Sequence, residues 1–391
     1  MDYYERAKEL HEEMRLHRRY IHQNAEVGMN LPKTAEYVTT KLVEMGYDPV
    51  RMCESGVMAT IGKESGKVLL LRADMDALPM AEESGLDFAS QNGCAHTCGH
   101  DFHAAMLLGA AKMLKEHEEE LEGMVKLVFQ PAEETFEGSR ALIENGVLEN
   151  PKVDAALAYH VGPGNAPVGY YMYNNSGTMM FSNDGFKITV KGKGAHGSYP
   201  QLSIDPINIA VHIYLALQEL IAREVPASSQ CVLTIGSLHA GTANNIIPET
   251  AELQGSIRSD SKESREHLVS RMKEVAVKVA DTYRGSAEVT MLSEVPPLTC
   301  NPDFTNEIIK YMSELPIEGM VGIPNIQASA SDDFALVLDK VPGCYMFLSA
   351  GFTDRQVASS HNPKVIFNEN VLPVGAACLA HCATQWLKNN K

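Results

Sequence analysis

The sequence lacks the features of membrane proteins, of nucleic-acid-binding proteins and of secreted proteins held together by disulfides. Its longest stretch without aspartate, glutamate, lysine or arginine, Ala155 to Asn183, is interrupted by four glycines, two prolines and four asparagines, so it does not predict a membrane helix. Lysine and arginine number 33 against 50 aspartates and glutamates, and the net charge of −17 argues against nucleic acid and anionic membranes as partners. Only eight cysteines are spread over 391 residues, and the N-terminal segment is charged rather than apolar. We therefore expect a protein of the reducing cytoplasm.

The length and the residue patterns predict two domains. A chain of 391 residues is roughly two to three times a typical domain. Strands and helices alternate up to residue 183, and the continuous apolar run Val68–Leu71 is typical of a strand covered on both faces. From 184 to 295 the pattern becomes β-α-β-β-α-β, and the α/β pattern then resumes. We predict a discontinuous α/β main domain (1–183 and 296–391) with a mostly parallel central sheet flanked by helices, and an inserted α+β, ferredoxin-like domain (184–295).

The first candidate site is a cluster of cysteine and histidine before a helix. Cys98 and His100 are two residues apart, and thiolate with imidazole suits zinc or a similar divalent metal. A helix N-terminus also lowers the pKa of a thiol. The alternative is a surface loop crowded with histidines and a buried small cysteine.

Acidic residues follow two apolar strands. Asp74 comes at the end of one strand, and Glu133 and Glu134 follow another. In an open α/β sheet the functional crevice lies at the carboxyl ends of the strands. Adjacent carboxylates repel each other unless a cation lies nearby, and one can bind a metal while the other accepts a proton from water. The alternatives are a capped strand end and a charged turn.

Two further histidines, His160 and His361, occur after a buried strand and in a late loop. A single histidine is more often structural than a metal ligand, so the argument is cumulative. The candidate ligands are Cys98, His100, Glu134, His160 and His361. This number suits two metals that share a ligand, and it leaves Glu133 free as a base.

Three strings carry a resemblance to a known family. They are RADMDALP (Arg72–Pro79), CGHD (Cys98–Asp101) and FQPAEE (Phe129–Glu134), in this order. With them the chain resembles the M20 metallopeptidase family, in the branch of hippurate hydrolases, aminoacylases, N-acetyl-diaminopimelate deacetylases and auxin-conjugate hydrolases. The likeness extends over essentially the whole chain.

The resemblance implies a role for each candidate residue. Cys98 would bridge two divalent metals, zinc foremost with manganese, cobalt and nickel open. His100 and His160 would complete one metal site, and Glu134 and His361 the other. Glu133 would be the general base, and Asp74 would orient a metal ligand from behind.

The inserted domain resembles the lid and dimerisation domain of the family. There His196 matches a histidine that stabilises the oxyanion, often in the partner subunit, while Asn245 and Arg258 match contacts to the amide and carboxylate end of the substrate. An arginine is the natural bidentate partner of a carboxylate. Without the resemblance, a strand-end histidine and a solvated arginine would be the preferred interpretations. We expect a homodimer, with the edge strand 230–237 pairing with its twin.

The implied function is a binuclear metal-dependent amidohydrolase that hydrolyses N-acyl amino acids with metal-activated water. The alternatives are a dipeptidase or carboxypeptidase of the same family, an enzyme with Cys98 as thiol nucleophile, and a non-catalytic metal-binding protein. The expected partner is a small molecule.

The chain departs from the family pattern at four positions. Ala25 replaces a proline, and Gln201 replaces a histidine. Ala330 and Asp332 replace a glycine and a glutamate. We expect the change at Ala25 to concern only a loop. The other three changes should affect the substrate pocket rather than the catalysis, with Ala330 and Asp332 reshaping the acyl pocket.

Overall fold

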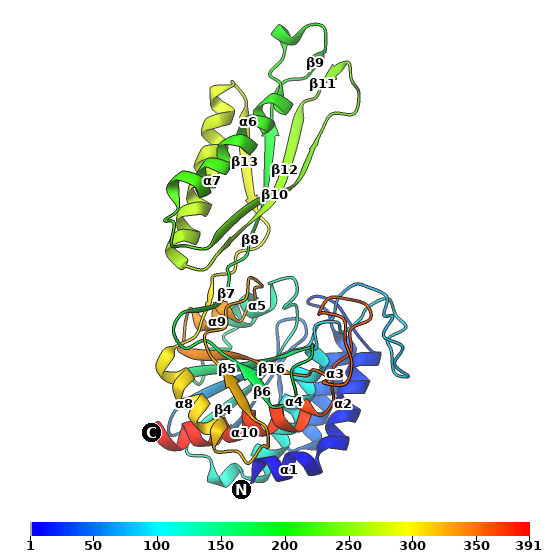
Figure 1. Cartoon of the computed structure of the whole chain (residues 1–391), viewed down its shortest axis with the longest axis vertical. Coiled ribbons are helices and arrows are strands. Elements are labelled where there is room, and N and C mark those ends of the chain that lie inside the picture. Colours follow the sequence, from blue (N-terminus) through cyan, green and yellow to red (C-terminus); the bar gives the residue numbers. More distant parts are fainter. Residues whose placement is uncertain (1) are drawn as a thin grey trace. The chain divides into compact units, whose positions relative to one another are not determined.

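The computed structural model describes residues 2–391, which form two compact units (Figure 1). Unit 1 contains the chain up to Met179, Thr299–Gln327 and Asp332–Lys391. Unit 2 contains Met180–Leu298 and Ala328–Ser331. Unit 2 thus covers the stretch for which the sequence predicts an inserted domain, with one short later segment added.

Unit 1 is built on an eight-stranded, mainly parallel sheet. In spatial order its strands are β1 (Val50–Met52), β2 (Gly56–Gly62), β4 (Met124–Gln130), β3 (Val68–Asp74), β5 (Ala155–Gly162), β16 (Gly343–Ser349), β6 (Tyr170–Met172) and β15 (Val321–Ile323). The three neighbours β4, β3 and β5 run in the same direction, with Leu71 opposite both Leu127 and Leu157. Their carboxyl ends therefore lie at one edge of the sheet.

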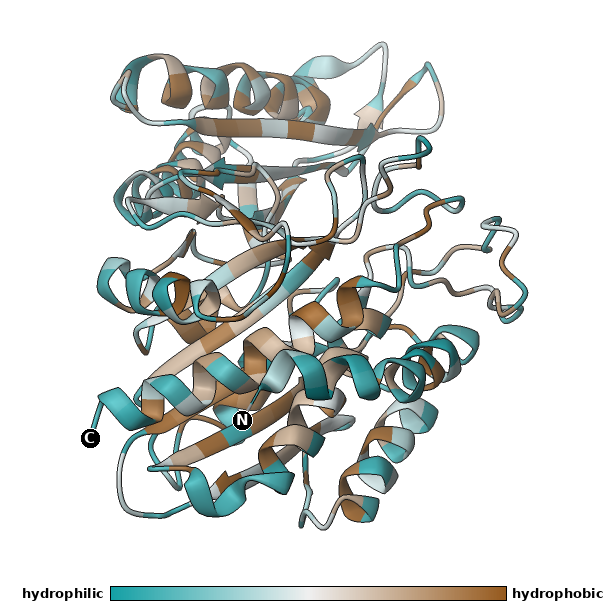
Figure 2. Cartoon of the chain, turned by 60° about the horizontal axis from the view of Figure 1, so that its bottom comes forward, coloured by the Kyte–Doolittle hydropathy of each residue, from teal (hydrophilic) through white to brown (hydrophobic). Residues whose placement is uncertain are grey.

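The apolar run that predicted a covered strand is buried on both faces. Every residue of β3 and β4 is buried. Figure 2 shows hydrophobic residues along the central strands and hydrophilic residues on the outer turns of the helices. This distribution explains the parallel pairing, because parallel sheets occur almost only where helices cover both faces.

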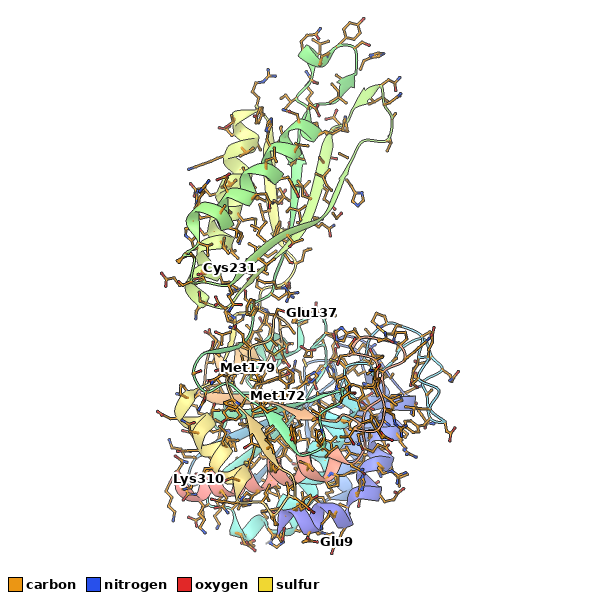
Figure 3. The ribbon with its side chains drawn as sticks, in the orientation of Figure 1. Glu9, Glu137, Met172, Met179, Cys231 and Lys310 are labelled. Atoms are coloured by element: carbon orange, nitrogen blue, oxygen red, sulfur yellow. The ribbon has the colours of Figure 1, made fainter. Side chains whose placement is uncertain are left out.

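The helices of unit 1 are α1 (Tyr3–Glu9), α2 (His11–Gln23), α3 (Pro32–Glu44), α4 (His100–Glu116), α5 (Gly138–Glu144), α8 (Pro302–Ser313), α9 (Ala335–Leu338), α10 (Val371–Asn389) and the short 3₁₀ helix η1 (Glu118–Glu120). Helices α4 and α10 are the most deeply buried and pack together. The side chains of Glu9 and Lys310 extend from surface helices into solvent (Figure 3). Within residues 2–391, none of the helices combines the length and the apolar character needed to cross a bilayer.

Unit 2 has the predicted βαββαβ topology. Its elements are β8 (Asp184–Lys191), α6 (Pro206–Glu219), β10 (Cys231–Ala240), β12 (Thr250–Ser259), α7 (Lys262–Thr282) and β13 (Ser286–Met291). The sheet is antiparallel, in the order β10-β12-β8-β13. This is the ferredoxin-like arrangement of two split βαβ units.

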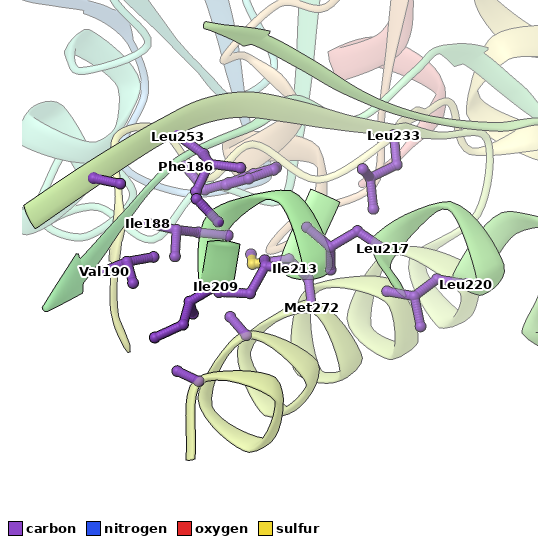
Figure 4. Packing of buried hydrophobic residues seen from close by; sticks show 14 of the residues in the cluster. Phe186, Ile188, Val190, Ile209, Ile213, Leu217, Leu220, Leu233, Leu253 and Met272 are labelled. Atoms are coloured by element: carbon purple, nitrogen blue, oxygen red, sulfur yellow. The ribbon is translucent and has the colours of Figure 1, made fainter. Parts of the chain in front are cut away.

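A single hydrophobic core stabilises unit 2. Phe186, Ile188 and Val190 alternate along β8 and pack against apolar residues of the two helices, as Figure 4 shows. Strand β10 lies at one edge of the sheet. The remaining elements are β9 (Ala195–His196), β11 (Ile246–Ile247), η2 (Pro200–Leu202), the π-helical turn η3 (Leu220–Glu224), and the paired strands β7 (Thr178–Met180) and β14 (Leu298–Thr299).

Candidate metal centre

The polar residues predicted after the strands of unit 1 lie at one edge of its sheet. Asp74 ends β3, Glu133 and Glu134 follow β4, and His160 lies near the end of β5. These strands are parallel neighbours. The edge therefore collects carboxylates and imidazole from segments distant in sequence, as expected at the carboxyl ends of an open α/β sheet.

Helix α4 begins at this edge because of one glycine. Gly99 has φ of 97°, and a Cβ atom there would lie 2.5 Å from Cγ2 of Val161. A larger residue would be strained and would clash. The turn lets the helix begin at His100, directly after Cys98 and Gly99.

Two groups of three donors share the sulfur of Cys98. Donor atoms of Cys98, His100 and His160 all lie within 4.8 Å of one another, and so do those of Cys98, Glu134 and His361. Cys98 Sγ is 3.4 Å from His160 Nε2. His361 Nε2 is 3.3 Å from Glu134 Oε1. The structure thus brings all five predicted ligands together.

The orientation of two histidines leaves their Nε2 atoms available. His100 Nδ1 lies 2.9 Å from the carbonyl oxygen of Asp76, and His160 Nδ1 lies 2.7 Å from that of Val161. Each Nδ1–H therefore donates to a carbonyl, which fixes the ring and directs Nε2 away from it. His100 Nε2 is buried and has no hydrogen-bond partner within residues 2–391. A buried polar atom without a partner is costly, and a metal cation would satisfy it.

His361 occupies an unusual backbone conformation. Its φ is 63°, in the left-handed region that residues other than glycine seldom adopt. Its backbone N–H donates to the carbonyl of Thr97, which lies beside Cys98 in the chain. Such strained residues cluster at functional sites.

The electrostatics of the edge favour added positive charge. Burial opposes the charged form of His100, yet Asp74 and Cys98 hold the pKa of this imidazole well above its usual range. Burial raises the pKa of the Cys98 thiol to about 12. Without a cation this thiol stays protonated at neutral pH, which disfavours the thiol-nucleophile interpretation. With the unsatisfied Nε2, the donor set fits two divalent cations that share Cys98.

Glu133 remains outside both donor groups that contain Cys98. Its carboxylate lies 3.8 Å from His100 Nε2. Burial, followed by the neighbouring charge of Asp332, holds the pKa of Glu133 well above its usual range. A raised pKa makes the ionised carboxylate a stronger base.

Asp74 makes its closest contacts away from the donor groups. One oxygen bonds Nδ1 of His103 in a very short contact, and the other accepts from Arg72 Nη1 at 2.6 Å. The second oxygen also lies 3.6 Å from His100 Nε2. The contact with His100 agrees with an orienting role, which stays a prediction.

Sequence reasoning missed Asp76 and His103. One oxygen of Asp76 accepts from the backbone N–H of Glu134 at 3.0 Å, and the other lies 3.3 Å from His100 Nδ1. His103 Nε2 accepts from the N–H of Val161 at 2.8 Å, so both ring nitrogens are engaged. The signal was present, because Asp76 belongs to the same string as Asp74 and His103 follows the Cys98–Asp101 string by two residues.

Asp332, one of the departures from the family pattern, lies inside the protein. This residue is 2 % exposed and receives hydrogen bonds from Arg72 Nη2 at 3.0 Å and Nη1 at 3.3 Å. Arg72 itself is 3 % exposed. A carboxylate paired with a buried guanidinium does not itself line an open pocket, and its effect on the acyl pocket stays a prediction.

The other predicted residues lie in unit 2. His196 is exposed on β9, and its backbone pairs with Ile246 on β11, next to Asn245. The N–H of Ser198 donates to His196 Nδ1 at 3.0 Å. Arg258 is half-buried on β12, and its Nη1 donates to Ser331 Oγ at 2.6 Å. Within residues 2–391, no carboxylate forms an ion pair with Arg258.

Comparison with known proteins agrees with the motifs. Residues 70–385 match the model of the family described as Peptidase family M20/M25/M40. An IAA-amino acid hydrolase ILR1-like 5 of Arabidopsis thaliana is 37 % identical over 95 % of this chain and 86 % of its own length. Thermostable carboxypeptidase 2 of Saccharolobus solfataricus is 36 % identical, covering 96 % and 95 %. An N-acetylcysteine deacetylase of Bacillus subtilis is 34 % identical, covering 96 % and 97 %.

A solved structure shares the whole architecture. A dinuclear metal-binding peptidase of the M20 family from Bacillus subtilis superposes with a TM-score of 0.81 at 32 % identity, covering 97 % of this chain and 99 % of that one. The predicted family and fold class are therefore confirmed.

Proposed function

Because the chain belongs to peptidase family M20/M25/M40, we propose that it is a two-metal amidohydrolase that cleaves the amide bond of N-acyl amino acids. The observation that carries this proposal is the pair of donor groups sharing Cys98, with the buried carboxylate of Glu133 beside them. Two relatives named for IAA-amino acids and N-acetylcysteine support the substrate class.

In this proposal Cys98, His100 and His160 hold one cation, and Cys98, Glu134 and His361 hold the other. When bound, two divalent cations would polarise the amide carbonyl and make water more acidic. Thiolate, imidazole and carboxylate together favour zinc, with manganese, cobalt and nickel as further candidates.

Glu133 supplies the proton transfers. It takes a proton from the attacking water as oxygen adds to the amide carbon, and it passes that proton to the amide nitrogen as the C–N bond breaks. The products are the carboxylate of the acyl group and the free amino acid. Asp76 holds His100 in place at Nδ1, and we assign an orienting role to Asp74, whose carboxylate lies 3.6 Å from Nε2 of the same ring.

We assign to His196 the role of a hydrogen-bond donor to the developing oxyanion, in the same chain or from a partner subunit. Because the N–H of Ser198 donates to its Nδ1, the neutral ring carries its proton on Nε2. That tautomer presents an exposed donor, as oxyanion stabilisation requires.

We assign to Arg258 and Asn245 the recognition of the substrate. The half-buried guanidinium of Arg258 bonds a serine hydroxyl but no carboxylate of the described chain. It therefore retains donors for a substrate carboxylate, in the bidentate geometry that arginine provides. Asn245 is exposed beside β11 and would contact the amide.

A homodimer through unit 2 belongs to the same proposal. Helix α6 exposes an apolar stripe at helical spacing, formed by Ile207, Val211, Tyr214 and Leu215. Strand β10 adds an unpaired sheet edge. Monomeric proteins seldom expose contiguous apolar surface of this kind.

The eight cysteines are all free, which supports a cytoplasmic location.

Hydrolysis of peptides is the second candidate, favoured by the similarity to a thermostable carboxypeptidase. The test is amine release from N-acetyl, N-benzoyl and longer N-acyl amino acids and from dipeptides, with chelator and with each metal added back. Chelator-sensitive cleavage of the N-acyl amino acids supports the proposal. Faster cleavage of dipeptides selects the alternative, and metal binding without any hydrolysis points to a binding protein.

A further inference from the structure

Two consecutive aspartates lie beneath Glu133 and have no role in the proposed function. Asp332 and Asp333 are 2 % and 0 % exposed. Both accept hydrogen bonds from Arg72 Nη2, at 3.0 and 3.3 Å. Arg72 precedes Asp332 by 260 positions in the chain, so local sequence does not reveal the cluster.

The two aspartates differ in how fully they are held. Asp333 accepts from Gln130 Nε2 at 2.6 Å, and from the N–H and hydroxyl of Ser139 at 2.8 and 3.0 Å, besides Arg72. Asp332 accepts from Arg72 and from the N–H of Phe334 at 2.8 Å. Asp333 therefore links β4 to α5 through hydrogen bonds, whereas Asp332 accepts hydrogen bonds from fewer groups.

The Glu133 carboxylate lies directly against this pair. Oxygens of Glu133, Asp332 and Asp333 are all within 4.8 Å of one another. On the other side, Glu133 Oε2 is 3.8 Å from His100 Nε2. Within residues 2–391 no hydrogen bond holds the Glu133 carboxylate, although its side chain is only 7 % exposed. Its orientation therefore depends on the charges around it.

We propose that Asp332 is a positioning residue for Glu133: clamped by Arg72, its carboxylate repels that of Glu133 and keeps it turned toward His100. This inference rests on the proposed function, in which Glu133 is the base. Repulsion between like charges a few ångströms apart is strong where water is excluded. A base held in the reactive geometry works faster, and a misplacement of about 1 Å can lower the rate roughly 100-fold.

A double-mutant cycle tests the inference, with Asp332→Asn, Glu133→Gln and the double variant in the metal-loaded protein. Asp332→Asn keeps the shape and removes the charge, so we expect kcat to fall about 10-fold to 100-fold while KM changes less than about twofold. Metal content should match the wild type, while the thermal unfolding midpoint should fall, because the substitution leaves the buried guanidinium of Arg72 with one carboxylate fewer. Asp332→Glu, which keeps the charge, should restore most of kcat, and the exposed Asp303→Asn is the control for net charge.

The decisive comparison is Asp332→Asn in the Glu133→Gln background. If Asp332 acts through Glu133, the second substitution removes little of the turnover that remains. An equal loss in both backgrounds, or a loss of metal, overturns the inference and leaves the proposed function intact. Undiminished turnover of Glu133→Gln alone would overturn both. If the asparagine variant does not fold, Asp332→Thr removes the charge in the same cycle.

Discussion

The sulfur of Cys98 lies 3.4 Å from Nε2 of His160, although 62 positions separate the two residues. The same sulfur also belongs to the donor group of Glu134 and His361. One side chain thus joins both halves of the site, and its loss should affect both metals at once.

Replacing Cys98 with serine should therefore disrupt both cation sites. We expect bound metal to fall from two ions per chain to one or fewer, and turnover to fall on the order of 100-fold or more. Elemental analysis of the purified protein with kcat measurement provides the test. Cys94→Ser is the matched control, because the half-exposed Cys94 lies outside both donor groups. Equal metal content in the two variants would contradict the shared-ligand model.

Replacing Arg258 with alanine should weaken the binding of substrates that carry a free carboxylate. The loss of a charged hydrogen-bonded pair, about 1.5–3 kcal/mol, corresponds to an increase of about 10-fold to 100-fold in KM. The amide-capped forms of the same substrates should change little. Steady-state kinetics on both forms gives the answer, and an equal effect on both would exclude carboxylate recognition by Arg258.

His17 makes stability depend on pH in unit 1. Burial lowers the pKa of His17 to about 4, from an ordinary value of 6.5. As the pH falls, the imidazole of His17 binds a proton in the unfolded chain before it does so in the folded chain. The contribution of His17 to the free energy of unfolding is therefore complete above pH 6.5 and declines as the pH falls to about 4. The decline attributable to His17 is about 3 kcal/mol, at about 1.4 kcal/mol per pKa unit.

The comparison for this prediction is His17→Gln, which keeps a partner for the hydroxyl of Tyr37, 2.9 Å from His17 Nδ1. Urea unfolding at pH 7, 6 and 5 should show a steeper loss in the wild type than in the variant. Parallel curves for the two proteins would show that His17 does not carry this pH dependence.

The apolar stripe of α6 should control the oligomeric state. Leu215 is 56 % exposed on this helix. Leu215→Asp should shift the protein from dimer to monomer in light scattering coupled to size exclusion, because a buried charge is costly at an interface. Val43 on α3 is equally exposed, at 56 %, and Val43→Asp should leave the mass unchanged. A monomeric mass for the wild-type protein would show that the proposed dimer is wrong.

The architecture was largely predictable, because the hydrophobic patterns are strong. The apolar run of β3 predicted a strand covered on both faces, and the β-α-β-β-α-β pattern from 184 to 295 predicted the topology of unit 2. Helix boundaries were less certain. The N-terminal segment forms two helices, α1 and α2, with a break at Leu10 that local composition does not mark.

The candidate metal ligands were identified on a different basis. Cys98 and His100 are close in sequence and Glu134 follows an apolar strand, but their roles as ligands come from the resemblance to the family and stay predictions. The support beneath the site was not predictable. Arg72 and Asp332 meet only because the fold brings segments 260 positions apart into contact, and no periodicity encodes that pairing.

The central claim is that Glu133 transfers the proton during amide cleavage but is not a ligand of either metal. Its most direct test is Glu133→Gln, with turnover and bound metal measured on the same preparation. The account predicts two ions per chain, as in the wild type, and a kcat lower by about 100-fold to 10,000-fold. Unchanged turnover with both ions present would contradict it.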